Sequence, residues 1–185
     1  AASLKEAASA VVTVKTSKGH GSGSVISNEG YIITNLHVVA DVLDDSVEVI
    51  LADGSARKAK AIRHNASYDL CLLATSPFHV APLRFDTTEH IDIGEEVYSI
   101  GTPAEIELGQ SVSKGIISGK RIVSNLTFIQ SDVSINPGNS GGAMVTREGL
   151  LIGVVNAKIV GSGLEGLGFA IPSSTISRAL NIEVR

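Results

Sequence analysis

Apolar and polar residues alternate over many short stretches of this chain, which is the pattern of half-buried β-strands. Residues 24–27 (SVIS) and 31–34 (YIIT) flank the turn residues Asn28, Glu29 and Gly30, so they predict a hairpin. Apolar runs or alternation predict the remaining strands at residues 10–15, 47–51, 57–63, 69–74, 96–101, 111–120, 127–132, 143–146, 150–159 and 166–171. Two helices are expected, one at 37–40 and one at 174–180 that is capped by Ser173 or Ser174 after Pro172.

A dozen short strands joined by turns predict an all-β sandwich or barrel rather than alternating βαβ units. Residues 76–94 have the weakest strand signal and contain Pro77 and Pro82, so we expect the chain to cross there between two lobes. Each lobe would be a small closed β-barrel, because closure removes exposed strand edges. The prediction is a single domain over residues 1–185, with barrels at about 10–76 and about 95–172 and a C-terminal helix at about 174–181.

Composition narrows the functional classes. The chain has 185 residues, 43% of them hydrophobic, which is enough for a buried core. A net charge of -4 without any run of Lys and Arg argues against nucleic-acid binding. No stretch reaches about 18 apolar residues, so no membrane span is expected, and residues 1–10 do not read as a signal peptide. Cys71 is the single cysteine and the histidines are scattered, so we expect neither an intrachain disulfide nor a metal site nor a cofactor.

The strongest chemical signal is the segment NPGNSGG at residues 136–142. A serine hydroxyl such as that of Ser140 becomes a good nucleophile when a base removes its proton. The oxyanion that forms then needs fixed backbone donors, and neighbouring glycines permit the unusual dihedral angles that aim them. Gly138 and Ser140 are the candidate donors of this oxyanion hole. The structural alternative is a polar turn between two strands.

His37 and Asp69 are the candidate base and acid. His37 lies where the strand YIIT gives way to a short helical turn, and Asp69 opens an almost wholly apolar strand, where an unpaired acid is costly to bury. A capped core histidine and a turn-capping acid are the structural alternatives. Asp132, just before the serine, is interpreted as a structural turn residue. The chain order His37, Asp69, Ser140 is that of the chymotrypsin class.

These motifs together make the chain resemble the HtrA (Deg) family of trypsin-like proteases. The matching segments are TNLHV (34–38), YDLCLL (68–73), IGTP (100–103), QSDVSINPGNSGGAMV (130–145), LIGVVNA (151–157) and GFAIP (168–172). The resemblance implies a chymotrypsin-like double β-barrel that cleaves unfolded or exposed polypeptide segments through an acyl-enzyme. In it His37 is the general base, Asp69 orients the histidine and Ser140 is the nucleophile, with no cofactor.

The resemblance also favours an extracytoplasmic, periplasmic location and leaves open a homo-oligomer and additional domains. The chain departs from the family in lacking a PDZ domain after the protease and a long loop between Thr16 and Gly21. Asn139 stands where zymogen-activated relatives have an aspartate, so activation by N-terminal cleavage is not expected.

The family fold places Ile135, Asn156 and Lys158 at the specificity pocket. Ser134, rather than an aspartate, lies six residues before the nucleophile. We therefore expect a small, mainly apolar pocket with a positive rim and cleavage after Val, Ala or Ile. In the alternative, Lys158 extends into solvent and has no influence on selectivity.

Three other functional interpretations are considered. The segment GNSGG fits G-x-S-x-G of the α/β-hydrolases, but residues 143–146 predict a strand and no histidine follows His90, so that class is rejected. A peptide-binding protein on the same fold without activity stays open, as does a protease whose oxyanion hole is not formed at rest.

Overall fold

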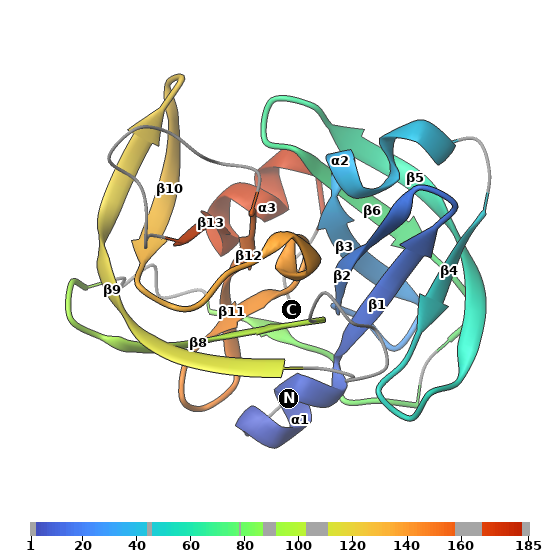
Figure 1. Ribbon diagram of the computed structural model, residues 1–185, viewed down its shortest axis with the longest axis horizontal. Coiled ribbons are helices and arrows are strands. Elements are labelled where there is room, and N and C mark those ends of the chain that lie inside the picture. The colour runs from blue at the N-terminus through green and yellow to red at the C-terminus, as the bar shows by residue number, and fades with distance from the viewer. Residues whose placement is uncertain are drawn as a thin grey trace.

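The computed structural model describes residues 3–43, 46–77, 79–86, 92–102, 111–157 and 168–182. It consists mainly of strands, arranged as two β-barrels that lie side by side (Figure 1). This arrangement confirms the all-β class and the double barrel predicted from the pattern of short strands. Lys158, which was predicted to line the specificity pocket, lies outside the described residues.

The first barrel is a closed antiparallel sheet in the order β1-β2-β3-β6-β5-β4. Pairing of β1 with β4 closes it, through Thr13 opposite Ile50. In β4, Val47 and Val49 are buried while Glu48 is exposed, so the predicted alternation is what fills the barrel with apolar side chains. The strands of this barrel are β1 (Val11–Thr16), β2 (Gly19–Val25), β3 (Tyr31–Asn35), β4 (Val47–Ile50), β5 (Ala56–Asn65) and β6 (Leu70–Ala74).

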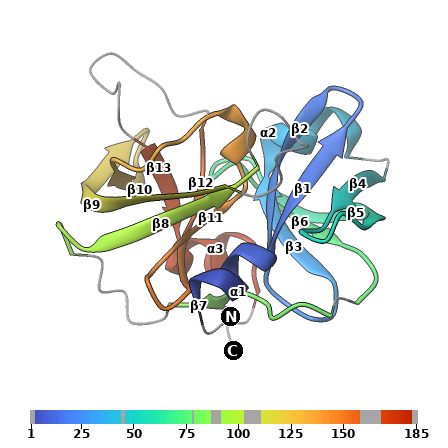
Figure 2. The ribbon, with the colours of Figure 1, turned by 60° about the horizontal axis from the view of Figure 1, so that its bottom comes forward.

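The second barrel has the strand order β11-β8-β9-β10-β13-β12 and closes by pairing of β11 with β12. A two-residue strand, β7 (Arg84–Phe85), adds to β12 in parallel. Figure 2 shows the two barrels as separate bodies with the strands β8 and β9 crossing the second one. The strands of this barrel are β8 (Glu96–Gly101), β9 (Ser111–Val123), β10 (Leu126–Ser131), β11 (Ala143–Val145), β12 (Leu150–Val155) and β13 (Gly168–Pro172).

Strand β2 begins five residues earlier than predicted, because its glycine-rich start is itself part of the sheet. A Cβ atom on Gly23 would lie 2.7 Å from Ile32 Cγ2, and one on Gly21 would lie 2.8 Å from Val38 Cγ2. Both contacts are too short for any side chain. The glycines therefore let β2 pack against β3 and against the short helix α2 (Leu36–Val39).

The helices differ from the prediction in two respects. Helix α1 (Leu4–Ser9) was not predicted, although Ser3 and Glu6 form the spacing of an N-terminal cap and Ser3 Oγ accepts the Glu6 N–H at 3.1 Å. Helix α3 (Ser173–Ala179) has Pro172 at its N-cap position without a side-chain cap, so the predicted serine cap was wrong. Ser173 Oγ instead donates to Leu151 O at 2.6 Å, because burial against β12 offers it that carbonyl.

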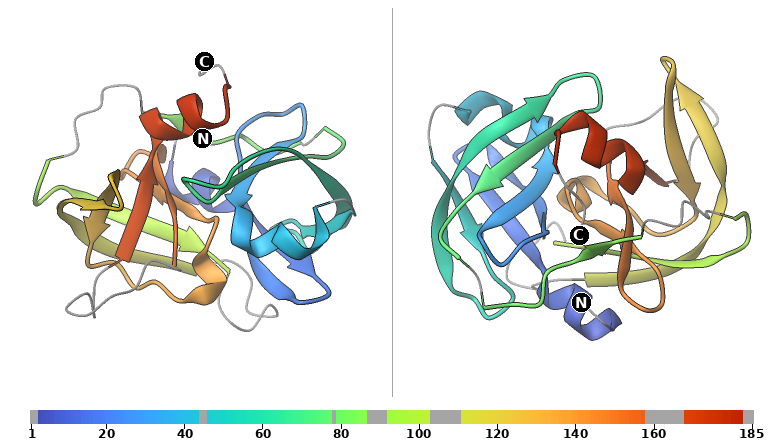
Figure 3. Two further views of the ribbon diagram at one scale, coloured as in Figure 1. Left: turned by 90° about the horizontal axis from the view of Figure 1, so that it is seen from above. Right: turned by 180° about the vertical axis from the view of Figure 1, so that it is seen from behind.

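Apolar side chains hold the two barrels together at a common seam. Ile33 and Leu70 of the first barrel belong to one buried cluster with Phe169 and Ile171 of the second and with Ile176 of α3. Figure 3 shows α3 over the junction of the barrels. Two of the segments that carry the predicted chemistry lie where the barrels meet. The start of β6 contributes Leu70 to this cluster, and the turn before β11 contacts β2 of the first barrel, where Ser140 O accepts the Ser22 N–H at 2.8 Å.

Candidate active site

His37 is held by the backbone around Asp69. It is the second residue of α2, which starts directly after β3. The N–H of Leu36 donates to Asp69 O at 2.9 Å, and Asn35 Nδ2 donates to the same carbonyl at 3.0 Å. These bonds fix the start of the helical turn to the start of β6, and this brings the imidazole to the acid.

Asp69 bonds to both the backbone and the ring of His37. Its Oδ1 accepts the His37 N–H at 2.8 Å, and its Oδ2 lies 2.5 Å from His37 Nδ1. Asp69 has a φ of 57°, a left-handed conformation that aspartate and asparagine tolerate better than most residues. The turn that leads to it is shaped by Asn65, whose Oδ1 accepts the Tyr68 N–H at 3.0 Å.

The Asp69 carboxyl is partly buried, yet it stays ionised. Burial raises its pKa, but the hydrogen bonds and charge interaction with His37 and a 3.1 Å hydrogen bond from Asn156 Nδ2 outweigh burial, so its pKa lies below the ordinary value. A carboxylate at this point accepts a hydrogen bond from the Nδ1–H of His37. The lone pair of the ring is then on Nε2, where a general base needs it.

Ser140 lies on a tight turn between η3 (Pro137–Asn139) and β11. The N–H of Ser22 donates to Ser140 O at 2.8 Å and ties this turn to β2 of the other barrel. Gly141 has a φ of 91°, and a Cβ atom there would lie 2.0 Å from Ser22 O. The glycine after the serine is therefore required both by its dihedral angle and by the approach of the two barrels.

The predicted nucleophile, Ser140 Oγ, and the predicted oxyanion donor, the Gly138 N–H, both make hydrogen bonds within the protein. Ser140 Oγ accepts the Ala157 N–H at 3.0 Å, and the Gly138 N–H donates to Asn136 Oδ1 at 3.0 Å. Among the described residues no hydrogen bond joins His37 to Ser140, although both line one hollow. The chemistry predicted from the sequence would require the Ser140 hydroxyl to turn to His37 Nε2 and the Gly138 N–H to exchange Asn136 for a substrate oxygen.

Two hollows meet at His37. The first, here called the hairpin hollow, has a volume of about 540 Å³ and extends from His37 and Ser140 to the β1–β2 turn and η1 (Ala40–Val42). The second, of about 360 Å³, lies on the Asp69 side and is lined by Tyr68, Phe128 and Asn156 among others. His37 lines both hollows.

The predicted pocket residues occupy different surroundings. Ile135 is half-buried, and a Cβ atom on Gly168 would lie 2.2 Å from its Cδ1, so that glycine makes room for the isoleucine. Asn156 is 4% exposed and directs its amide to Asp69. Its contact with the acid was missed from the sequence, because residues 87 positions apart carry no local signal of contact.

Two other groups are separate from this chemistry. Asp132 Oδ1 accepts the Ile116 N–H of β9 at 2.8 Å, and no hydrogen bond links it to His37 within the described part of the chain. Burial raises the pKa of the Cys71 thiol to about 12, so it is not an alternative nucleophile. No group of three or more His, Cys, Asp or Glu in the described ranges is placed to hold a metal ion, and none of the described helices could cross a membrane.

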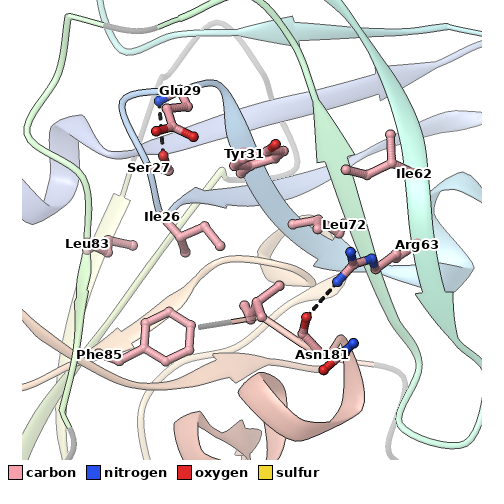
Figure 4. Close-up of a pocket in the computed structure, with 11 residues that line it drawn as sticks. Ile26, Ser27, Glu29, Tyr31, Ile62, Arg63, Leu72, Leu83, Phe85 and Asn181 are labelled. Atoms are coloured by element: carbon pink, nitrogen blue, oxygen red, sulfur yellow. Dashed lines mark hydrogen bonds between the residues drawn. The ribbon is translucent and has the colours of Figure 1, made fainter. Parts of the chain in front are cut away.

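A further cavity of about 350 Å³ lies at the back of the seam (Figure 4). Its walls are of mixed polarity and include Tyr31, Leu72 and Phe85. Arg63 also lines it and donates to Asn181 O at 2.6 Å. None of His37, Asp69 and Ser140 lines it. This cavity is therefore separate from the candidate active site.

Residues 21–154 of the chain match the family described as Trypsin-like peptidase domain. The chain is 37% identical over 177 residues to "Serine protease Do-like HtrA" of Lactobacillus helveticus, covering 89% of this chain and 42% of that protein. It is 41% identical over 158 residues to "Probable periplasmic serine endoprotease DegP-like" of Pseudomonas putida, covering 82% of this chain and 32% of that protein.

Solved structures agree with these relatives. The structure titled "HtrA-type protease AlgW with tripeptide" superposes with a TM-score of 0.83 at 36% identity, over 96% of this chain and 60% of that one. The chain thus spans less than half the length of these curated relatives and under two thirds of that solved chain.

Proposed function

Because this chain belongs to the trypsin-like peptidase family, as an HtrA-type serine protease domain, we propose that it hydrolyses peptide bonds of unfolded or exposed polypeptides through His37, Asp69 and Ser140. The observation that carries the proposal is the bonding of Asp69 to both the backbone and the ring of His37, in a cleft that also contains Ser140. No other acid bonds to His37 among the described residues.

The reaction proceeds in two halves. Ser140 Oγ attacks the carbonyl carbon of the substrate while His37 Nε2 takes its proton, and His37 then gives that proton to the departing amine as the peptide C–N bond breaks. Water, deprotonated by His37, attacks the resulting ester and releases the acid with regeneration of Ser140. Asp69 keeps Nδ1 protonated and stabilises the positive charge that develops on the ring.

The carbonyl oxygen becomes negatively charged in each half. We assign its stabilisation to the N–H groups of Gly138 and Ser140. The bond between Gly138 N–H and Asn136 Oδ1 supports a resting arrangement in which this donor is released when substrate binds. The peptide-binding alternative differs at this step, because a protein that never released the donor would bind peptide without cleaving it.

The acyl side of the substrate is proposed to lie along Asn156 and Ala157, with its last side chain toward Ile135. Ile135 takes up space beside Gly168, so only small or medium aliphatic side chains, such as Val, Ala and Ile, would fit. Lys158 would contribute a positive rim that disfavours Lys and Arg.

We also propose an extracytoplasmic location and additional domains in a longer protein. The support is the name of the Pseudomonas putida relative, which reads "Probable periplasmic serine endoprotease DegP-like", and the greater length of the relatives. Whether copies of the chain associate would be read from its mass in solution.

Hydrolysis of casein tests the function directly. The wild-type chain should release peptides from casein. A serine-directed phosphonate inhibitor should abolish this release and phosphonylate Ser140 with loss of the inhibitor's leaving group, which mass spectrometry detects as an adduct. A chain that binds an unfolded polypeptide with no cleavage and no adduct on Ser140 would support the peptide-binding alternative instead.

A further inference from the structure

The hairpin hollow is built by two separate elements that diverge from the catalytic centre. One wall is the β1–β2 turn with Lys18 and His20, and the other is α2 and η1 with Val38 and Asp41. Figure 2 shows the β1–β2 hairpin and α2 on the same side of the first barrel. His37 also lines the hollow, and the second barrel contributes Ser140 and Ala157 to it.

The position of the hollow decides which part of a substrate would enter it. If the acyl side lies along Asn156 and Ala157 and toward Ile135, the departing amine is on the other side of the reacting bond, next to the imidazole that protonates it. The hollow starts at His37 and continues to the β1–β2 turn. The residues after the scissile bond, here called the leaving segment, are the part that fits there.

Two charged side chains in the hollow have no partner in the described part of the chain. Lys18 and Asp41 are both exposed, and neither makes a side-chain hydrogen bond or an ion pair with a described residue. They lie on opposite walls. A charge that no internal partner neutralises is available to a peptide that lies between the walls.

The two charges lie at different distances from the reacting bond. Asp41 comes four residues after His37, in η1 rather than α2, which is roughly 6–7 Å along helical backbone that rises about 1.5–2.0 Å per residue. Lys18 comes four residues before Ser22, which touches Ser140, and this is about 13 Å along a strand at about 3.3 Å per residue. In an extended leaving segment, Asp41 therefore faces the first or second residue and Lys18 the third or fourth.

We propose that Asp41 and Lys18 are specificity-determining residues that select leaving segments with a basic residue at the first or second position and an acidic residue at the third or fourth. The proposal rests on the proposed peptidase function. It assigns a substrate class by charge order, which is independent of the apolar side chain selected on the acyl side.

Three peptides test the charge order. They share one acyl side that ends in Val and continue as Lys-Ala-Ala-Glu, as Glu-Ala-Ala-Lys or as four Ala. Exposed charge pairs change kcat/KM by about 1.4- to 5-fold each, so two favourable pairs should place the first peptide about 2- to 25-fold above the four-Ala peptide at low ionic strength. The second peptide, whose two charges are both repelled, should fall below the four-Ala peptide. In about 1 M salt, where the screening length is about 3 Å, this preference should fall toward one.

Charge-reversed variants show which residues are responsible. Lys18→Glu combined with Asp41→Lys should invert the preference between the two charged peptides and leave kcat/KM for the four-Ala peptide within about twofold. Lys60→Glu combined with Glu148→Lys makes the same changes of charge at exposed positions outside the hollow and should leave the preference unchanged.

The outcomes separate this proposal from the function on which it rests. Equal, Ser140-dependent cleavage of both charged peptides by the wild-type chain would overturn the charge selection and leave the peptidase standing. A preference that persists unchanged in the Lys18→Glu, Asp41→Lys variant would also overturn it. No cleavage of any of the three peptides, together with no cleavage of casein, would overturn the peptidase function itself.

Discussion

At the residue scale, the backbone conformation and the charge of Asp69 both serve to hold the His37 ring in place. The left-handed φ of 57° turns the chain so that one carboxylate oxygen meets the His37 N–H and the other meets the ring. Two bonds to the same histidine fix both its position and its tautomer. The Asn156 amide adds a third bond from the other barrel.

Asp69→Asn is expected to keep the backbone conformation at residue 69 and to lose most of the peptidase activity. Asparagine tolerates the left-handed φ, but its amide does not hold the Nδ1 proton as a carboxylate does, so kcat should fall by about 10⁴. Peptidase kinetics and a circular dichroism spectrum check this together. A variant with native spectrum and a loss of less than about tenfold would show that Asp69 does not orient the histidine.

The same carboxylate gives stability a defined pH dependence. Its folded pKa lies below the ordinary value of 3.8, so the ionised form stabilises the fold above that pH, and this contribution is lost as pH falls through the folded pKa. The gap in unfolding free energy between the wild-type chain and Asp69→Asn should be constant above about pH 5 and shrink below the ordinary pKa. Urea titrations at a series of pH values measure it, and a gap that closes near neutral pH would contradict the assignment.

The sequence predicted single residues correctly where burial of a charge limits the possible environments of one side chain. An acid at the head of the apolar strand 69–74 was preferred to Asp132 as the partner of His37, and the structure brings Asp69 to the ring while Asp132 bonds to β9. Contacts between residues far apart in the sequence, such as that of Asn156 with Asp69, could not be predicted in this way. The bond of Asn136 to Gly138 was not predicted, although an asparagine side chain commonly accepts the backbone N–H two residues after it.

At the scale of elements, the turn that carries Ser140 depends on the glycine after it. Gly141 combines a φ of 91° with a position 2.0 Å from Ser22 O for any added Cβ atom, whereas Gly54 has a φ of 89° with no atom within 4 Å. The two glycines thus share a backbone conformation and differ in their surroundings. This makes Gly54 a matched control for Gly141.

Gly141→Ala should destabilise the protein more than Gly54→Ala does. Gly54→Ala pays the left-handed dihedral cost alone, about 1–2 kcal/mol, whereas Gly141→Ala must also push β2 away from Ser140 and should remove activity. Thermal unfolding and casein hydrolysis of both variants provide the comparison. Equal destabilisation with full activity in both would show that the contact with Ser22 does not shape the turn.

Elements with a regular pattern were predicted well, and elements defined by close contact were not. Alternation gave the strands of both barrels, with β8 predicted at its observed bounds. The start of β2 was not predicted because it is rich in glycine, which a pattern of apolar and polar residues does not identify as a strand. The glycines are needed there because Ile32 and Val38 pack against the backbone, and these contacts cannot be read from the local sequence. Helix α1 is short, and its N-terminal Ser3 and Glu6 were its usable signal.

At the scale of the whole molecule, the proposed active site draws its residues from both barrels and lies where they meet. His37 and Asp69 come from the first barrel, while Ser140 and Asn156 come from the second. The Ser22–Ser140 and Asn156–Asp69 bonds cross the seam directly. The sequence predicted two barrels and a crossover, but it had no means to give their relative placement, which depends on the complementary fit of the apolar cluster at the seam.

The central claim is that Ser140, activated by His37, is the nucleophile of a peptidase, and turnover of casein by Ser140→Ala tests it most directly. Members of a catalytic triad act as a unit, so Ser140→Ala and His37→Ala should each lower kcat by about 10⁶, and the double variant should lose little more. All three should keep the wild-type circular dichroism spectrum. A folded Ser140→Ala protein that retained about a tenth of wild-type turnover would contradict the account.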